Sequence, residues 1–282
     1  MNTADMKTTV DQAVQSKAGK LHEKPVLVLL TDFGSRDGYA GVMKGVVLQF
    51  APHAEMVDLS HEIAPHAIDD ASFVLLTSYK YFPKGTLFTV VVDPGVGTER
   101  KIIGVQTPDY GFLAPDNGVL GPIFAFEPVY KVYEITEKRL FLSNVSATFH
   151  GRDIFAPLSG RYLNGVTFPE MGREGASFHK GGIEHPVIRG DKISGKIIYR
   201  DHFGNLISNI FIEDVKRLFK TRPVLIRVGK YQIKDFSETF RSGGGRSLQA
   251  YPDSSGFVGF SIFQKNAAEE TGLKKGDLVE IF

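Results

Sequence analysis

The sequence predicts an α/β protein: an N-terminal domain with a mostly parallel sheet and flanking helices, followed by a C-terminal β-barrel-like domain. Two observations support this prediction. Between residues 26 and 92, near-continuous apolar strands alternate with segments of helical spacing, which is typical of a sheet covered on both faces. From about Ile193 onward the apolar runs are short, and turn-forming residues separate several of them, which favours a small β-rich domain.

Apolar patterning places the elements of the first domain. A continuous apolar run predicts a buried strand at Val26–Leu30. Helical spacing predicts a helix at Tyr39–Phe50, and an acidic first turn, which suits the helix dipole, supports a second helix at Ile68–Tyr79. Further strands are expected at Ala54–Asp58, Thr86–Val92, Ile102–Gln106, Gly111–Ala114 and Val129–Ile135, with a further helix at Asp153–Leu163.

The second domain is expected to contain short strands at Lys196–Tyr199, Asn205–Ile210, Val224–Val228, Phe257–Ile262 and Leu278–Ile281. We place the domain boundary between residues 187 and 188, so that residues 25–187 form the α/β domain and residues 188–282 the β domain. Residues 1–24 are polar and contain lysines, and they lack the apolar core of a secretory signal. We therefore expect a flexible N-terminal extension there.

The composition argues against several classes of protein. The formal net charge is only +1 and no basic stripe is present, so we expect no nucleic-acid partner. No apolar run approaches the roughly 20 residues that a membrane helix needs, so we expect no membrane partner. The absence of cysteine excludes disulfides and a cysteine nucleophile. A cytoplasmic enzyme is the default expectation.

Two binding patterns are also absent. His61 and His66 are five residues apart, not four, and Pro65 disfavours a helix there, so this segment is interpreted as a polar loop and not as a zinc helix. The sequence contains no phosphate-binding P-loop, which argues against nucleoside triphosphates as substrates. We expect neither a metal nor a cofactor.

Two aspartates come at or just after the ends of predicted strands, and each precedes a glycine-bearing turn. They are Asp32 and Asp93, and open α/β sheets bind ligands at this edge. Asp32 could accept two hydrogen bonds from the adjacent hydroxyls of a ribose, or it could simply hold its turn. Asp37 could meet an ammonium group, or it could cap the helix that follows.

Three residues could form a polar trio. Asp93 is followed seven residues later by Arg100, and His150 precedes a glycine and a predicted helix. An isolated histidine is usually structural, but in one cleft with Asp93 and Arg100 it would help to hold and polarise a water. In the second domain, the ring of Phe203 could stack on an adenine and the side-chain amide of Asn205 could bond to the edge of the base. Alternatively, both residues could belong to a hairpin turn.

Taken together, these residues resemble the S-adenosylmethionine (SAM) hydroxide adenosyltransferase family, which is related to the fluorinase and chlorinase enzymes. The resemblance runs from about Pro25 to the C-terminus. Five ordered motifs carry it: TDFGSRDGYAGVMKG, VVDPGVGTER, APDNGVL, TFHGRDIFAP and DHFGNLISNI.

The resemblance implies an N-terminal α/β domain joined to a C-terminal β-barrel, and a homotrimer with active sites between subunits. It also implies that Asp93, Arg100 and His150 position and activate a water. Halogenases depart from this set, and fluorinases insert a long loop where this chain has only the short connection Thr107–Gly111. Both differences favour water over halide as the nucleophile.

The same matching assigns the substrate-binding residues. Asp32 should bind the ribose hydroxyls, and Asp37 should lie near the methionine end of the substrate. In the second domain, Asp201 is a further candidate for the methionine amino group, Phe203 and Asn205 for adenine, and Ser254 and Ser255 for the methionine carboxylate. The stretch Lys265–Ala267 matches the part of the family that reads the adenine edge.

The expected reaction is hydrolysis of S-adenosyl-L-methionine to adenosine and L-methionine, by attack of an activated water on the ribose 5′ carbon. The sulfonium substrate already carries positive charge, so the reaction needs no metal. Two alternatives stay open at this point. One is a chloride-dependent adenosyltransferase on the same fold, and the other is a non-catalytic protein that binds SAM or adenosine.

Overall fold

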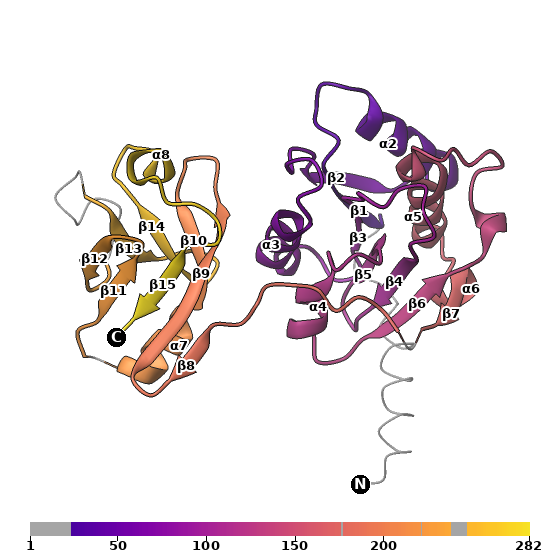
Figure 1. The fold of residues 1–282 in the computed structure, drawn as a ribbon. Helices are drawn as coiled ribbons and strands as arrows, with labels where there is room; N and C mark the ends of the chain where they lie inside the picture. The colour runs from indigo at the N-terminus through magenta and orange to yellow at the C-terminus, as the bar shows by residue number, and fades with distance from the viewer. Residues whose placement is uncertain (1–23, 176, 221, 238–246) are drawn as a thin grey trace, which may run out of the picture. The chain divides into compact units, whose positions relative to one another are not determined.

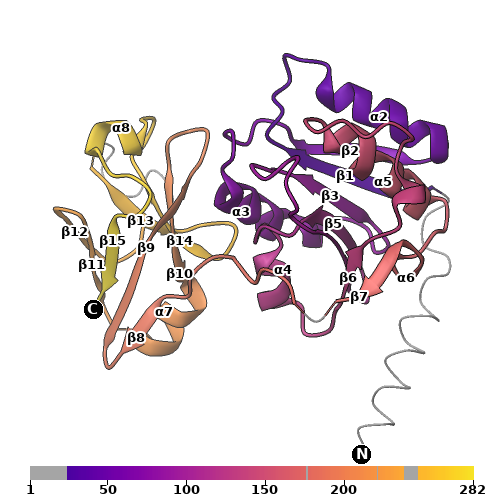
Figure 2. The same ribbon diagram turned by 45° about the vertical axis from the view of Figure 1, so that its right-hand side comes forward.

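The computed structural model describes residues 24–175, 177–220, 222–237 and 247–282 (Figures 1 and 2). The extension expected at residues 1–24 therefore lies outside the described residues, apart from Lys24. The chain divides after Gly182 into two compact units, the second beginning at Ile183.

The first unit is built on a seven-stranded sheet of order β2-β1-β3-β5-β4-β6-β7. The strands β2, β1, β3 and β5 run parallel to one another, whereas β4, β6 and β7 join the sheet through antiparallel pairs, beginning with the pair of β5 and β4. Their bounds are β1 Val26–Thr31, β2 Glu55–Ser60, β3 Leu87–Val91, β4 Ile102–Gln106, β5 Gly111–Pro115, β6 Lys131–Ile135 and β7 Gly172–Glu174.

The central strand β1 supplies side chains to two cores, one on each face of the sheet. Val28 and Leu30 belong to the core that includes Leu75 of α3 (Ile68–Ser78), while Leu27 and Leu29 belong to the core that includes helices α2 (Tyr39–Phe50) and α5 (Ala156–Leu163). Successive residues of a strand point to opposite faces of the sheet, so a strand covered on both faces needs a continuous apolar run. Full burial of each such side chain contributes roughly 1.5–3 kcal/mol to the stability of the fold. Figure 1 shows α2 and α5 together on one face.

The remaining helices of the first unit are short. They are α4 Gly121–Phe126, α6 Phe168–Met171, the 3₁₀ turns Tyr79–Tyr81 and Lys138–Leu140, and a π-helix at Gly151–Phe155 that leads directly into α5.

The second unit is a barrel-like antiparallel sheet. Seven strands follow the order β12-β11-β15-β9-β10-β14-β13, and β8 also pairs with β9. Their bounds are β8 Val187–Arg189, β9 Lys192–Arg200, β10 Leu206–Phe211, β11 Leu225–Val228, β12 Tyr231–Lys234, β13 Gln249–Pro252, β14 Phe257–Ser261 and β15 Leu278–Ile281, with helices α7 Ile212–Phe219 and α8 Ala267–Thr271. Its core includes Ile197, Leu206 and Phe260.

The predicted fold class is confirmed, and the structure contains elements that the sequence pattern did not predict, among them α4, α7, α8, β12 and β13. The expected helix Asp153–Leu163 begins as the π-helix, and Pro157, which has no backbone N–H, lies in the first turn of α5 directly after it. The sequence pattern missed α7 because β10 runs into it with no turn residue between them. No helix in the described ranges is long and apolar enough to cross a membrane.

Close packing around Gly104 gives a first prediction. Gly104 is buried in β4, and a Cβ atom built there would lie 2.3 Å from a ring carbon of the Phe168 side chain. We therefore expect Gly104→Ala to lower the free energy of unfolding by about 1–3 kcal/mol through overpacking, as measured by denaturant unfolding.

Gly41 provides the matched control, since a Cβ there meets no atom within 4 Å and the residue is exposed in α2. Gly41→Ala should raise the stability by about 0.5–1 kcal/mol, because alanine is the better helix former. Equal effects of the two substitutions would contradict the packing described for Gly104.

Candidate active site

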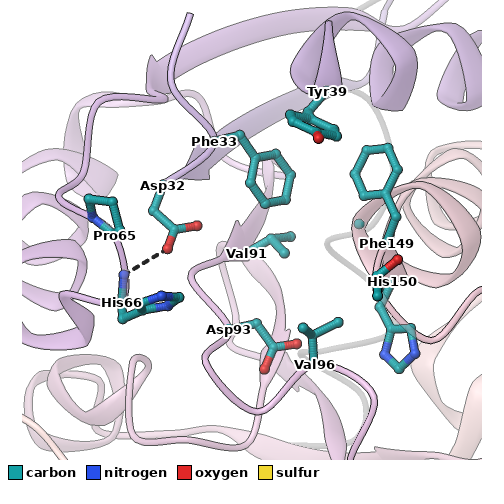
Figure 3. A pocket seen from close by; sticks show the side chains of 12 residues that line it. Asp32, Phe33, Tyr39, Pro65, His66, Val91, Asp93, Val96, Phe149 and His150 are labelled. Carbon is teal, nitrogen blue, oxygen red and sulfur yellow. Dashed lines mark hydrogen bonds between the residues drawn. The ribbon is translucent and has the colours of Figure 1, made fainter. Parts of the chain in front are cut away.

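A pocket of about 280 Å³ opens where β1 and β3 end (Figure 3). Because β1 and β3 are parallel neighbours, the residues that follow them reach the same edge of the sheet. Asp32 comes directly after β1, and Asp93 comes two residues after β3. The lining residues are Asp32, Phe33, Tyr39, Pro65, His66, Val91, Asp93, Val96, Thr148, Phe149, His150 and Gly151.

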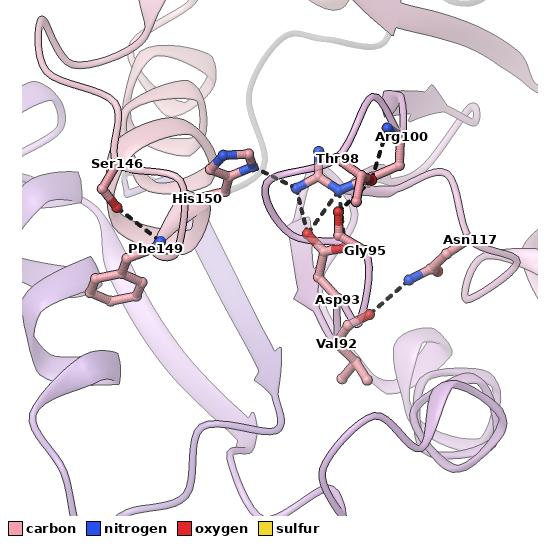
Figure 4. A network of polar contacts seen from close by, with 9 residues as sticks. All are labelled: Val92, Asp93, Gly95, Thr98, Arg100, Asn117, Ser146, Phe149 and His150. Carbon is pink, nitrogen blue, oxygen red and sulfur yellow. Dashed lines mark hydrogen bonds and ion pairs between the residues drawn. The ribbon is translucent and has the colours of Figure 1, made fainter.

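A tight turn after Asp93 brings Arg100 back onto its carboxylate. The turn is held by hydrogen bonds from Val96 N to Asp93 O and from Thr98 N to Gly95 O. Arg100 Nε then donates to Asp93 Oδ1 at 3.0 Å and to Oδ2 at 2.8 Å, and Nη2 also contacts Oδ2 (Figure 4). The side chains are only 11% and 5% exposed, so each charge depends on the other for its stability at this depth.

Arg100 also fixes the protonation of His150. Its Nη2 lies 2.9 Å from His150 Nδ1, and a guanidinium nitrogen can only donate. His150 Nδ1 must therefore accept, which leaves the proton on Nε2 and the ring neutral. Burial, together with the adjacent Arg100 charge, lowers the pKa of His150 below its ordinary value.

The loop before α5 holds His150 in place. Asp153 is buried, and its Oδ2 accepts the backbone N–H of Ser146 at 2.8 Å, while Arg152 Nε donates to Oδ1 at 2.6 Å. His150 directly precedes the π-helix, a conformation that is frequent at functional sites. A Cβ atom on Gly151 would lie 3.1 Å from the Phe33 ring, so the backbone approaches the pocket wall closely here.

Asp32 is tied to the loop after β2. Its Oδ2 accepts the backbone N–H of His66 at 2.9 Å. The same loop is anchored by Gly34 N, which donates to His61 O at 2.7 Å, and by a 2.8 Å hydrogen bond between Thr31 Oγ1 and His61 Nδ1. His61 is therefore a buried structural residue, whereas His66 lines the pocket.

Asp37 lies outside the pocket lining and is exposed. The N-cap residue of α2 is Gly38, and no side chain caps this helix. The structure therefore gives no support to the capping role considered for Asp37.

Five of the predicted substrate-binding residues belong to the second unit. Asp201 Oδ1 and Oδ2 accept the backbone N–H and side-chain amide of Asn205, both at 2.8 Å. Phe203 is 74% exposed, which leaves its ring available to a ligand. Ser254 is exposed, and the backbone N–H of Ser255 donates to Asp253 Oδ1 at 2.8 Å.

Two groups of site residues escaped the sequence argument. Phe33, Tyr39 and Phe149 line one side of the pocket, with the ring of Phe149 edge-on to the other two at centroid distances of 5.8 and 5.1 Å. Asn117 Nδ2 donates to Val92 O at 2.8 Å and so holds the backbone just before Asp93. The motif APDNGVL contains Asn117, but nothing in its pattern specifies this bond.

In the described ranges, no cluster of three or more His, Cys, Asp or Glu side chains is arranged to hold a metal ion.

The bond from Asn117 gives a stability prediction. Asn117→Ala would leave the buried Val92 carbonyl without its partner, so we expect the free energy of unfolding to fall by about 1–3 kcal/mol. Thermal or denaturant unfolding measures this loss. Asn164→Ala, at an exposed helix end, is the control and should change stability by less than about 0.5 kcal/mol. Equal losses of stability in the two variants would contradict a stabilising role for the hydrogen bond between Asn117 and Val92.

The contact between Arg100 and His150 gives a pH prediction. The pKa of His150 is lower in the folded state, so the unfolded state binds the extra proton first, and the contribution of His150 to stability is lost as the pH falls below about 6.5. At pH 7 we expect the ring nitrogens to give ¹⁵N NMR signals of an unprotonated Nδ1 and a protonated Nε2. A doubly protonated ring at pH 7 would contradict this geometry, and His150→Ala identifies the signals.

Known proteins resemble this chain along most of its length. Residues 27–172 match the SAM hydroxide adenosyltransferase N-terminal domain, and residues 195–280 match the C-terminal domain of that family. An (R)-S-adenosyl-L-methionine hydrolase from Methanocaldococcus jannaschii is 31% identical, covering 91% of this chain and 95% of the relative. A fluorinase from Nocardia brasiliensis is more distant, at 23% identity over 92% of this chain and 97% of its own length.

The fold is shared with solved structures as well. The crystal structure of an uncharacterized conserved protein from Thermotoga maritima superposes with a TM-score of 0.84 at 36% identity, covering 90% of this chain and 99% of that one. Both domain models match in order and together span most of the sequence. The chain therefore belongs to the SAM hydroxide adenosyltransferase family.

Proposed function

We propose that this protein hydrolyses S-adenosyl-L-methionine to adenosine and L-methionine, by attack of a water on the ribose 5′ carbon. The observation that carries the proposal is that Asp93 and His150 line one pocket and that Arg100 contacts both of them. The substrate follows from the relatives, of which the one from M. jannaschii is named (R)-S-adenosyl-L-methionine hydrolase.

The charge of the pocket suits a sulfonium substrate. Arg100 neutralises Asp93, whereas Asp32 has only a backbone N–H as its partner in the described contacts. The lining thus carries a net negative charge, which favours a cation. The aromatic side chains of Phe33, Tyr39 and Phe149 line the same pocket, and aromatic faces also attract cations.

The reaction forms one bond and breaks one. The water oxygen bonds to the 5′ carbon while the carbon–sulfur bond breaks and its electron pair goes to sulfur. Sulfur leaves as the neutral thioether of methionine, so the leaving group needs no acid. The attacking oxygen becomes strongly acidic as it bonds to carbon, and a carboxylate is a sufficient base for its proton. Alignment of the water in a near-attack geometry contributes several kcal/mol.

Each member of the trio has a distinct role in this proposal. His150 keeps its proton on Nε2 because Arg100 occupies Nδ1, so its Nε2–H can hold the oxygen of the water. Asp93 retains free lone pairs beside its bonds to Arg100 and takes the departing proton. Arg100 holds both groups and stabilises the negative charge that develops on oxygen.

The other predicted site residues keep their proposed roles. Asp32 takes part in binding the ribose hydroxyls, and Asp37 lies near the methionine end. In the second unit, Asp201, Ser254 and Ser255 bind methionine, and Phe203 and Asn205 face adenine. We also propose a homotrimer with active sites between subunits and a cytoplasmic location, both of which rest on the sequence arguments given above.

Incubation with S-adenosylmethionine, with and without chloride, tests the proposal when products are separated by chromatography. We expect adenosine and methionine in equal amounts, with no dependence on chloride, because the net negative charge of the pocket lining repels a halide. A 5′-chlorinated nucleoside would establish a halogenase instead, and tight binding without any product would establish a binding protein.

Substitution of the trio gives a direct prediction. Asp93→Asn and His150→Ala should each lower kcat by at least about 10²-fold, whereas substrate binding, measured by calorimetry, should change much less. Asp214→Asn, in an exposed ion pair with Arg217, and His53→Ala, at an exposed turn, are the controls. Full turnover in both active-site variants would remove the trio from the mechanism.

A further inference from the structure

His66 adopts a backbone conformation that is costly for its residue type. Its φ angle is +67°, and only three other non-glycine residues in the described ranges have a positive φ: Lys220, Asp235 and Gln264. Of these four, His66 is the one that lines the pocket. A residue with a Cβ atom in this left-handed region stores strain, and such residues concentrate at functional sites.

The backbone of His66 does not explain the choice of histidine. Its N–H donates to Asp32 Oδ2, and its carbonyl accepts the N–H of Ile68 at 2.9 Å. Glycine would make both bonds with less strain. A reason for histidine must therefore come from the side chain.

The imidazole of His66 is directed into the pocket, between the carboxylates of Asp32 and Asp93 as Figure 3 shows. The residue is exposed, and in the described part of the chain no other side chain bonds to the ring. An imidazole has one nitrogen that donates and one that accepts when it is neutral. It can therefore pair with a hydroxyl group in either direction.

We propose that His66 and Asp32 together read the two ribose hydroxyls of the substrate, a step that rests on the proposed function. Asp32 Oδ2 is already engaged by the backbone N–H of His66, which leaves Oδ1 directed to one hydroxyl. The imidazole of His66 takes the other hydroxyl. The strained backbone is what places both groups on the same side of the pocket.

The consequence is selectivity for a ribonucleoside over a deoxyribonucleoside. A site built to bond a hydroxyl discriminates against the analogue that lacks it, because its polar groups are left unpaired. One neutral hydrogen bond corresponds to about fivefold to tenfold in affinity. His66 should thus account for discrimination at one ribose hydroxyl, and Asp32 at the other.

Calorimetric binding of adenosine, 2′-deoxyadenosine and 3′-deoxyadenosine to the full chain tests this role. We expect the unaltered protein to bind adenosine most tightly. His66→Gly should bring the affinity of one deoxynucleoside to within about twofold of adenosine and leave discrimination against the other intact. The same substitution should raise the melting temperature, because it relieves the strain at φ +67°.

Two further variants separate the side chain from the backbone. Lys220→Gly relieves a similar positive φ of 56° in the second unit and should leave all three affinities unchanged. His66→Asn tolerates the left-handed conformation and carries an amide, so it should restore part of the lost discrimination.

The outcomes distinguish this proposal from the function on which it rests. If His66→Gly discriminates among the three nucleosides as the unaltered protein does, His66 has no role in reading the sugar, and hydrolysis by the trio is unaffected. If the unaltered protein neither binds adenosine nor hydrolyses S-adenosylmethionine, the proposed function itself fails. Loss of discrimination at one hydroxyl with a gain in stability supports the role of His66.

Discussion

Arg100 connects the two halves of the proposed catalytic apparatus, because its guanidinium contacts Asp93 through Nε and His150 through Nη2. These two partners lie 57 residues apart in the sequence and come from different loops. Since a guanidinium is always charged and only donates, it holds a carboxylate on one side and an imidazole lone pair on the other. One largely buried cation thus pairs with the Asp93 carboxylate and sets the tautomer of His150.

The rest of the fold brings these loops together. The parallel pairing of β1 and β3 sets Asp32 and Asp93 at one edge of the sheet, with covered faces on both sides. Asn117 holds the backbone before Asp93, and the buried Asp153 holds the loop that carries His150. These supporting hydrogen bonds matter because a catalytic group displaced by about an ångström loses much of its effect on the reaction rate. Groups that never touch the substrate therefore contribute to its geometry.

The sequence revealed those features that depend on local pattern. The bounds of α2 and β4 follow from apolar spacing alone, and the prediction of each agreed with the structure to the residue. Helix α7 was missed because a strongly apolar strand continues into it without a turn signal. The sequence shows a glycine turn between Asp93 and Arg100, but the contact of Arg100 with His150 depends on long-range packing that no local pattern encodes. The positive φ of His66 is similarly invisible, since its loop contains no glycine at that point.

The central claim is that a water attacks the ribose 5′ carbon of a sulfonium substrate held in this pocket. The most direct measurement is turnover of S-adenosylmethionine in ¹⁸O-labelled water, followed by mass spectrometry of the products. The mechanism predicts one ¹⁸O atom in the 5′ hydroxyl of adenosine and none in methionine. Unlabelled adenosine would contradict it. So would ¹⁸O in a product formed by cleavage of the bond between the sulfur and the carbon chain of methionine.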